Sequence, residues 1–238
     1  MAREVKLPAF LLMRDNMDFW FDFPNFTSGS DGVSSLLTGT GAAAAVADSL
    51  TGLLVMGTGV VANNSVIVRS TNALYQIANN RPIIAEARLQ YAEAAVNQAN
   101  VAFGVTDTPT ATWLGDNAGG PKTTGTQVMI YKTAGASNWR AQARNGTAFS
   151  DSGSGTTAGG TNYTILRVEV KDMSLTQATC YYSVDGVPLR DALTGLVINH
   201  QINLSGALLM DVACMLKCNS TTAEALNLDY MGASQTRF

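Results

Sequence analysis

The acidic residues of this 238-residue chain are the first candidates for chemistry, because two carboxylates on one strand face can cleave a glycosidic bond. Such a pair needs an even separation along the strand, since successive side chains of a strand point to opposite faces. The nearest acids, Glu86 with Glu93 and Glu169 with Asp172, have odd separations. Their spacing therefore indicates solvated strand charges and not a catalytic pair.

The single histidine and the three cysteines form no recognisable catalytic or metal-binding pattern. A serine–histidine–aspartate triad would have to use His200, but the G-x-S-x-G turn that often carries such a serine is absent. Zinc is disfavoured because Cys180, Cys214 and Cys218 include no C-x-x-C pair. We expect His200 on the surface or on an edge strand, and we expect no catalytic residue, metal or cofactor.

The cysteines favour synthesis in a reducing compartment, because their number is odd and a chain of this size folds without disulfides. On one face of a strand, Cys214 and Cys218 would stand about 13 Å apart, too far to bridge each other. Buried free thiols are the simplest interpretation. A Cys180–Cys214 bridge between neighbouring strands is the alternative.

A sugar-binding site needs less machinery, namely an aromatic platform and a few amides or carboxylates for the sugar hydroxyls. Trp113 with Asp116 and Asn117, together with Trp139, offers these groups, and we take the four residues as candidate glycan contacts. The alternative is that both tryptophans pack in the core or at an interface. Trp113 lies in residues 107–125, a long stretch rich in Gly, Pro and Thr, and long ordered loops often carry function.

Charge and composition argue against two classes of partner. Charged residues make up 14% of the chain and the formal net charge is −3, with no run of Lys or Arg that would attract phosphates. The apolar stretch Ala9–Met13 is far shorter than the ~20 residues of a membrane span. We therefore expect no nucleic acid or membrane partner, and neither a signal peptide nor an anchor.

Three strand-like runs in the C-terminal third are the elements that must position any site: Tyr163–Val170, Ala178–Val187 and Leu226–Phe238. Each alternates side chains with period two, which is typical of half-buried strands. Asp185 and Gly186 interrupt the second run with residues that tolerate positive φ, so we expect a β-hairpin there.

Earlier parts of the chain contain shorter runs of the same kind. Residues 18–23, DFWFDF, are expected to form the first strand. Residues 82–91 alternate apolar and mainly polar side chains, so we expect a strand with residues 100–106 as its antiparallel partner. A helix over residues 85–99 is the rival, because its residues are good helix formers. Residues 150–161, SDSGSGTTAGGT, are expected to form an exposed loop.

A single large β domain fits the length of the chain. We expect this domain over residues 18–238, preceded by an N-terminal arm, residues 1–17. The arm combines a polar start with the apolar segment PAFLLM, so it packs either on an edge of its own domain or on a neighbouring subunit.

The clearest sequence pieces, LRVEVKD (166–172), YYSVDGVPL (181–189) and LNLDYMGASQTR (226–237), resemble the concanavalin A-like (laminarinase and lectin-type) jelly-roll domains of tailed-bacteriophage virion proteins. The resemblance implies an all-β fold, a two-sheet antiparallel β-sandwich with an extended N-terminal arm. The chain departs from the hydrolases of this superfamily, because their acid motif E-x-D-x-x-E is absent.

The resemblance implies a virion structural protein that is not an enzyme, such as a capsid decoration, head-surface or fibre component that assembles as a homo-oligomer. Its expected partners are copies of itself and the major capsid protein or another virion protein. Its expected location is the virion, after synthesis in the host cytoplasm. A lectin-like, carbohydrate-binding adhesion module that contacts surface glycans is the alternative, and an unusual glycoside hydrolase is a third hypothesis.

Overall fold

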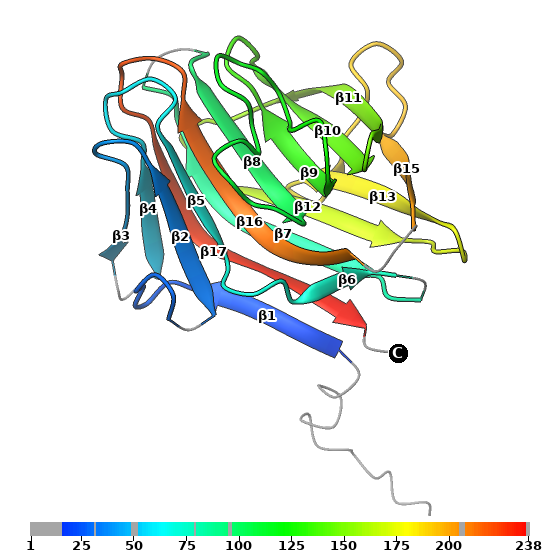
Figure 1. The fold of residues 1–238 in the computed structure, drawn as a ribbon. Helices are drawn as coiled ribbons and strands as arrows, with labels where there is room; N and C mark the ends of the chain where they lie inside the picture. The colour runs from blue at the N-terminus through cyan, green and yellow to red at the C-terminus, as the bar shows by residue number, and fades with distance from the viewer. Residues whose placement is uncertain are drawn as a thin grey trace, which may run out of the picture.

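The computed structural model describes residues 16–30, 32–48, 52–78, 80–94, 97–204 and 208–236. Within these ranges the regular elements are all β-strands, and no helix occurs among them. The strands form two antiparallel sheets that pack face to face (Figure 1). The expected all-β, two-sheet sandwich is therefore confirmed.

Sheet A contains the three C-terminal runs that the sequence singled out. Its order is β14 (Val187–Pro188), β13 (Gln177–Val184), β12 (Thr164–Lys171), β7 (Ile83–Tyr91), β17 (Ala225–Thr236), β4 (Leu53–Gly57) and β3 (Ala43–Asp48), with β1 (Asn16–Asp22) beside β17 and β15 (Asn199–Asn203) beside β13. The turn between β13 and β14 has Asp185 at φ 52° and Gly186 at φ 75°, which confirms the predicted hairpin.

Sheet B forms the other layer. Its order is β11 (Ala148–Thr157), β10 (Asn138–Asn145), β9 (Thr126–Lys132), β8 (Ala99–Thr106), β16 (Leu208–Cys218), β5 (Ser65–Ser70) and β2 (Val33–Thr38), with β6 (Tyr75–Ile77) beside β16.

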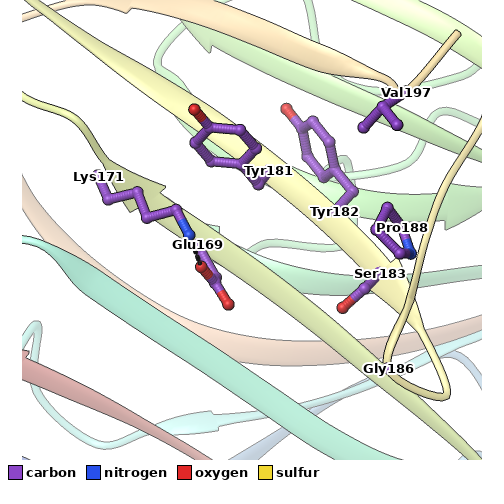
Figure 2. A pocket seen from close by; sticks show the side chains of 8 residues that line it. All are labelled: Glu169, Lys171, Tyr181, Tyr182, Ser183, Gly186, Pro188 and Val197. Carbon is purple, nitrogen blue, oxygen red and sulfur yellow. Dashed lines mark ion pairs between the residues drawn. The ribbon is translucent and has the colours of Figure 1, made fainter.

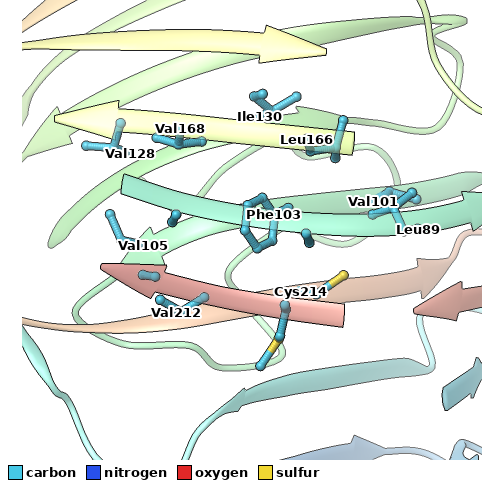
Figure 3. Packing of buried hydrophobic residues seen from close by; sticks show 14 of the residues in the cluster. Leu89, Val101, Phe103, Val105, Val128, Ile130, Leu166, Val168, Val212 and Cys214 are labelled. Carbon is cyan, nitrogen blue, oxygen red and sulfur yellow. The ribbon is translucent and has the colours of Figure 1, made fainter. Parts of the chain in front are cut away.

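The main core lies between the two sheets, where Phe103 of β8 and Cys214 of β16 face Leu89 of β7 and Val168 of β12 (Figure 3). In β7 every second side chain from Ile83 to Tyr91 is buried, so the strand prediction is confirmed and the rival helix is wrong. Burial of the apolar face stabilises the sandwich by roughly 25 cal/mol per Å².

The outer face of sheet B carries a second, smaller core. Trp113 and Leu114 of the 107–125 loop pack there against Met129 and Met215. Lys217 of β16 fastens the loop, because its Nζ donates hydrogen bonds to the carbonyls of Ala111 (3.1 Å) and Leu114 (3.0 Å). The chain therefore covers part of this face with its own loop.

Two local predictions are wrong. Residues 100–106 are not the partner of β7, because β8 lies in sheet B between β9 and β16, whereas β7 lies in sheet A between β12 and β17. All of β8 is buried, as expected of a strand with a core on each face.

The second wrong prediction is the loop at residues 150–161, because most of this stretch belongs to edge strand β11. Asn145 of β10 pairs with Ala148 of β11, so Gly146, at φ 62°, and Thr147 form the two-residue turn between these strands. Glycine with positive φ at the first position of a two-residue loop favours a hairpin, and an edge position does not require large apolar side chains.

Most of the predicted N-terminal arm, residues 1–17, lies outside the described residues. Residues 1–15 of the arm are not described, and β1 begins at Asn16, inside the expected arm. The division into this arm and one domain otherwise stays a prediction.

Candidate functional site

The four residues predicted as glycan contacts do not form one site in the structure. Trp113 lies in the outer core of sheet B and Trp139 lies in the core between the sheets, so the two rings are on opposite faces of sheet B and both are fully buried. Asp116 and Asn117 are exposed in the loop with Trp113; Asp116 pairs with Lys217. Neither tryptophan offers a ring face to a sugar in this structure.

Two adjoining hollows instead open on the outer face of sheet A. The first has a volume of about 370 Å³ and is lined by Glu169, Lys171, Tyr181, Tyr182, Ser183, Gly186, Pro188 and Val197 (Figure 2). The second has a volume of about 460 Å³ and is lined by Glu86, Ile165, Arg167, Glu169, Ser183, Asp185 and Gly186. Because Glu169, Ser183 and Gly186 line both, we treat the hollows as one site, the sheet A groove.

Strand register positions the polar residues of the groove. Arg167 of β12 lies opposite Glu86 of β7 on one side and Ser183 of β13 on the other. Glu169, two residues further along β12, lies opposite Tyr181. Since side chains two residues apart share a strand face, all five point to the outer face of the sheet.

An ion-pair network holds the carboxylates of the groove in place. Arg167 donates from Nε to Glu169 Oε1 (2.7 Å) and from Nη1 to Glu86 Oε2 (3.2 Å). Lys171 Nζ lies 2.6 Å from Glu169 Oε2 (Figure 2), and the Tyr230 hydroxyl donates to Glu86 Oε1 at 2.6 Å. Each carboxylate is therefore held by two partners.

The protonation state of Glu169 follows from these contacts. Partial burial acts to raise its pKa, but the hydrogen bonds from Lys171 and Arg167 outweigh burial, so the pKa of Glu169 lies below its ordinary value. The carboxylate is ionised at neutral pH and can accept hydrogen bonds from a ligand.

Tyr181 supplies an aromatic ring to the first hollow. Lys171 Nζ lies 4.7 Å from the centroid of this ring, and the Tyr181 hydroxyl donates to the Asp172 carboxylate. The hydrogen bond to Asp172, followed by burial, raises the pKa of Tyr181. Pro188 and Val197 line the same hollow (Figure 2). The groove thus combines charged oxygens, an aromatic ring and apolar side chains.

The spacing of acids along single strands did not reveal this arrangement. The acid spacing predicts separate solvated charges at Glu86 and Glu169, whereas the register of β7 and β12 brings both to one groove with Arg167 between them. The sequence does place Glu86 and Glu169 at outward-facing positions of two predicted strands, which is the signal that could have indicated a shared site. The missing information was which strands are neighbours.

His200 lies on β15 at the edge of sheet A and is buried. Its Nδ1 is 3.1 Å from the Tyr182 hydroxyl and its Nε2 is 3.0 Å from Ser152 Oγ. Burial lowers the pKa of His200 to about 4, against a smaller opposing effect of the Asp151 charge. The edge-strand position matches the expectation.

The three cysteines are buried free thiols, so the Cys180–Cys214 bridge is not formed. Over the described ranges, no three His, Cys, Asp or Glu side chains gather closely enough to hold a metal ion. The same ranges contain no helix long and apolar enough to span a membrane.

Sequence comparison and structure comparison give different results. No family model and no curated protein matches the chain. The carbohydrate recognition domain of Emp47p matches with a TM-score of 0.58 and 12% identity, over 92% of this chain and 94% of that one. An endo-1,3-beta-glucanase from Streptomyces sioyaensis matches with a TM-score of 0.59 and 12% identity, over 98% and 99% of the two chains.

The chain has the concanavalin A-like jelly-roll fold. An endo-beta-1,4-glucuronan lyase from the fungus Trichoderma reesei shares this fold, with a TM-score of 0.56 and 12% identity over 90% of this chain and 94% of that one. At such identities the likeness shows the fold alone.

These comparisons overturn the expectation that the chain is not an enzyme. That expectation treated a jelly roll without the E-x-D-x-x-E motif as non-catalytic. The fold is shared by a glucanase and a polysaccharide lyase as well as by a carbohydrate recognition domain, so it does not separate binding from catalysis.

Proposed function

We propose that this protein binds glycans in the sheet A groove. The observation that carries the proposal is the combination, in one hollow, of the Tyr181 ring with the Glu169 carboxylate and the Ser183 hydroxyl. An aromatic ring packs against the C–H face of a sugar, and oxygen groups beside it bind the sugar hydroxyls. Two proteins that share the fold, a carbohydrate recognition domain and an endo-1,3-beta-glucanase, are named for carbohydrates, which supports the proposal.

The size and rigidity of the groove also support binding. Its hollows of about 370 and 460 Å³ lie within the range of roughly 300 to 1,000 Å³ that small-ligand sites occupy. Arg167 and Lys171 already hold Glu169 in position, so a ligand would not have to order this carboxylate. Preorganised groups of this kind lower the entropic cost of binding.

The test is binding to immobilised glycans by the wild-type protein and the Tyr181→Ala variant. We expect the variant to bind at least about tenfold more weakly, which corresponds to about 1.4 kcal/mol. The matched control is Tyr163→Ala, because Tyr163 also carries a cation over its ring, the Arg88 guanidinium at 4.4 Å, but lines neither hollow. Equal losses in the two variants, or no glycan binding by the wild type, would count against the proposal.

We also propose that the protein is a structural component of a tailed-bacteriophage virion, at the capsid surface or in a fibre, where copies assemble as a homo-oligomer with each other and with another virion protein. The resemblance of residues 166–172, 181–189 and 226–237 to virion modules supports this role. Glycan binding at the surface of a particle is compatible with it.

An exposed apolar turn favours such assembly. Asp191 Oδ1 accepts hydrogen bonds from the backbone N–H groups of Leu193 (3.0 Å) and Thr194 (2.8 Å), which fixes the turn. Leu193 is 96% exposed and Leu196 is 69% exposed. Apolar side chains presented together on a fixed turn are typical of a surface that another protein covers.

Light scattering of the purified protein tests assembly. We expect an oligomer for the wild type and a smaller species for the double variant Leu193→Ser and Leu196→Ser, with Leu175→Ser as the control for an exposed leucine elsewhere. Electron micrographs of particles made with and without the protein test the virion role. A monomer at high concentration that is also absent from particles would contradict it.

A further inference from the structure

We propose that the sheet A groove selects an uncharged sugar over an acidic one, so that its ligand is a neutral glycan and not a polyuronate. The inference rests on the proposed function of glycan binding and adds the chemical class of the ligand. It follows from the charges that line the groove and from the partners that each of them already has.

The cations of the groove are already engaged by carboxylates. Arg167 pairs with both Glu86 and Glu169, and Lys171 pairs with Glu169. Among the described residues that line the two hollows, these are the only cationic side chains. The carboxylate of an acidic sugar would therefore have to compete with Glu169 for the same two cations.

The charge balance of the groove also opposes an anion. Glu86, Glu169 and Asp185 contribute three carboxylates against the two cations, which leaves one negative charge in excess. Asp172 adds a carboxylate beside the lining residues, where it accepts a hydrogen bond from the Tyr181 hydroxyl. Because like charges brought together weaken association, a uronate would be repelled by the same groups that hold the groove in shape.

A neutral sugar meets neither obstacle. A carboxylate has about four lone-pair positions, so Glu169 and Glu86 can accept hydrogen bonds from sugar hydroxyls while keeping their ion pairs. Ser183 can donate and accept, and Tyr181 offers its ring. Such a ligand would use the network as it stands, without breaking it.

The experiment compares polyuronates with their carboxyl-reduced forms, which keep the linkage and length but lack the charge. Binding of glucuronan and alginate oligosaccharides and of their reduced counterparts is measured at low salt, beside a panel of neutral glucans. We expect neutral ligands to bind at least about tenfold more tightly than any acid form. Equal or tighter binding of an acid form would overturn the inference and leave glycan binding intact, whereas no Tyr181-dependent binding of any glycan would overturn the proposed function itself.

The Glu169→Gln variant tests the cause of the selection. It removes the carboxylate that Arg167 and Lys171 share, so we expect binding of the polyuronate to increase about tenfold relative to wild type. The control is Asp229→Asn, which frees Arg88 on the same sheet but outside the groove. An unchanged preference in a folded Glu169→Gln protein would contradict the inference; if that variant does not fold, Glu86→Gln frees Arg167 from its other partner and is judged by the same measurement.

Discussion

Arg167 stands where two carboxylates from neighbouring strands converge. Its guanidinium contacts Glu86 and Glu169, and all three side chains are partly exposed. Ion pairs at such a position contribute little to the free energy of folding, since water screens them. Their contribution is geometric, because a planar group with several fixed donors sets the orientation of both carboxylates.

The two buried tryptophans are residues on which the core depends. We expect Trp139→Ala to lower the free energy of unfolding by about 3–5 kcal/mol, because a large fully buried side chain is replaced by a cavity. Urea denaturation followed by circular dichroism measures the change. Leu175→Ala, at a position that is 83% exposed, should stay within about 0.5 kcal/mol of wild type. A Trp139→Ala protein as stable as wild type would show that the ring is not packed as described.

His200 should make stability depend on pH. Burial lowers its pKa to about 4 from an ordinary value of 6.5, so the unfolded chain takes up a proton at a higher pH than the folded chain does. The free energy of unfolding therefore falls as the pH drops from about 6.5 toward 4, by up to about 3 kcal/mol.

The variant His200→Gln isolates this contribution, because glutamine does not titrate. Between pH 6.5 and about 5, before most carboxylates titrate, the wild type should lose more stability in urea denaturation than the variant. Parallel pH profiles for the two proteins would rule out the assignment to His200.

Among the strands, side-chain alternation in the sequence was informative for those with one buried face and one solvent-exposed face. The alternation in residues 82–91 predicted β7 with the correct faces, and the alternation in residues 163–170 predicted β12. The pattern failed for β8, which is buried on both faces and therefore carries no alternation that would place it in a sheet. Strand order is a long-range property, so the groove, which needs β7 and β12 as neighbours, could not be derived from either strand alone.

Lys217 is a buried cation that ties the 107–125 loop to sheet B. Lys217→Met should leave the carbonyls of Ala111 and Leu114 without their donor, at a cost of about 1–3 kcal/mol, and should loosen the loop. Hydrogen exchange measures this, with faster exchange expected at the amides of Trp113 and Lys122, which hydrogen-bond within the loop.

The control for the loop is Asp116→Asn, which removes the ion pair with Lys217 at a side chain that is 62% exposed. It should speed exchange less than Lys217→Met does, because Lys217 keeps its hydrogen bonds to both carbonyls. Unchanged protection of Trp113 in the Lys217→Met protein would show that packing on sheet B, and not Lys217, holds the loop.

At the scale of the whole molecule, the two outer faces differ in use. Sheet B is partly covered by the 107–125 loop and its second core. Sheet A is open over β7, β12 and β13, where both hollows lie. The protein therefore has one face committed to its own packing and one face available to a ligand.

The three thiols report on the integrity of the entire sandwich. Burial raises the pKa of Cys214 to about 12 and raises that of Cys180 still further, and Cys218 is also buried. A thiol reagent should therefore label the native protein slowly at all three positions and label the unfolded protein rapidly. Mass spectrometry counts the labels; fast labelling of any one cysteine under native conditions would show that its part of the core opens independently.

The pairing of β1 with β17 has a mechanical consequence. Asn16, where β1 begins, lies opposite Thr236, where β17 ends, so the first and last strands run antiparallel from one corner of sheet A (Figure 1). A force that separates these two ends loads the hydrogen-bonded rungs one after another, like a zipper, instead of shearing them all at once.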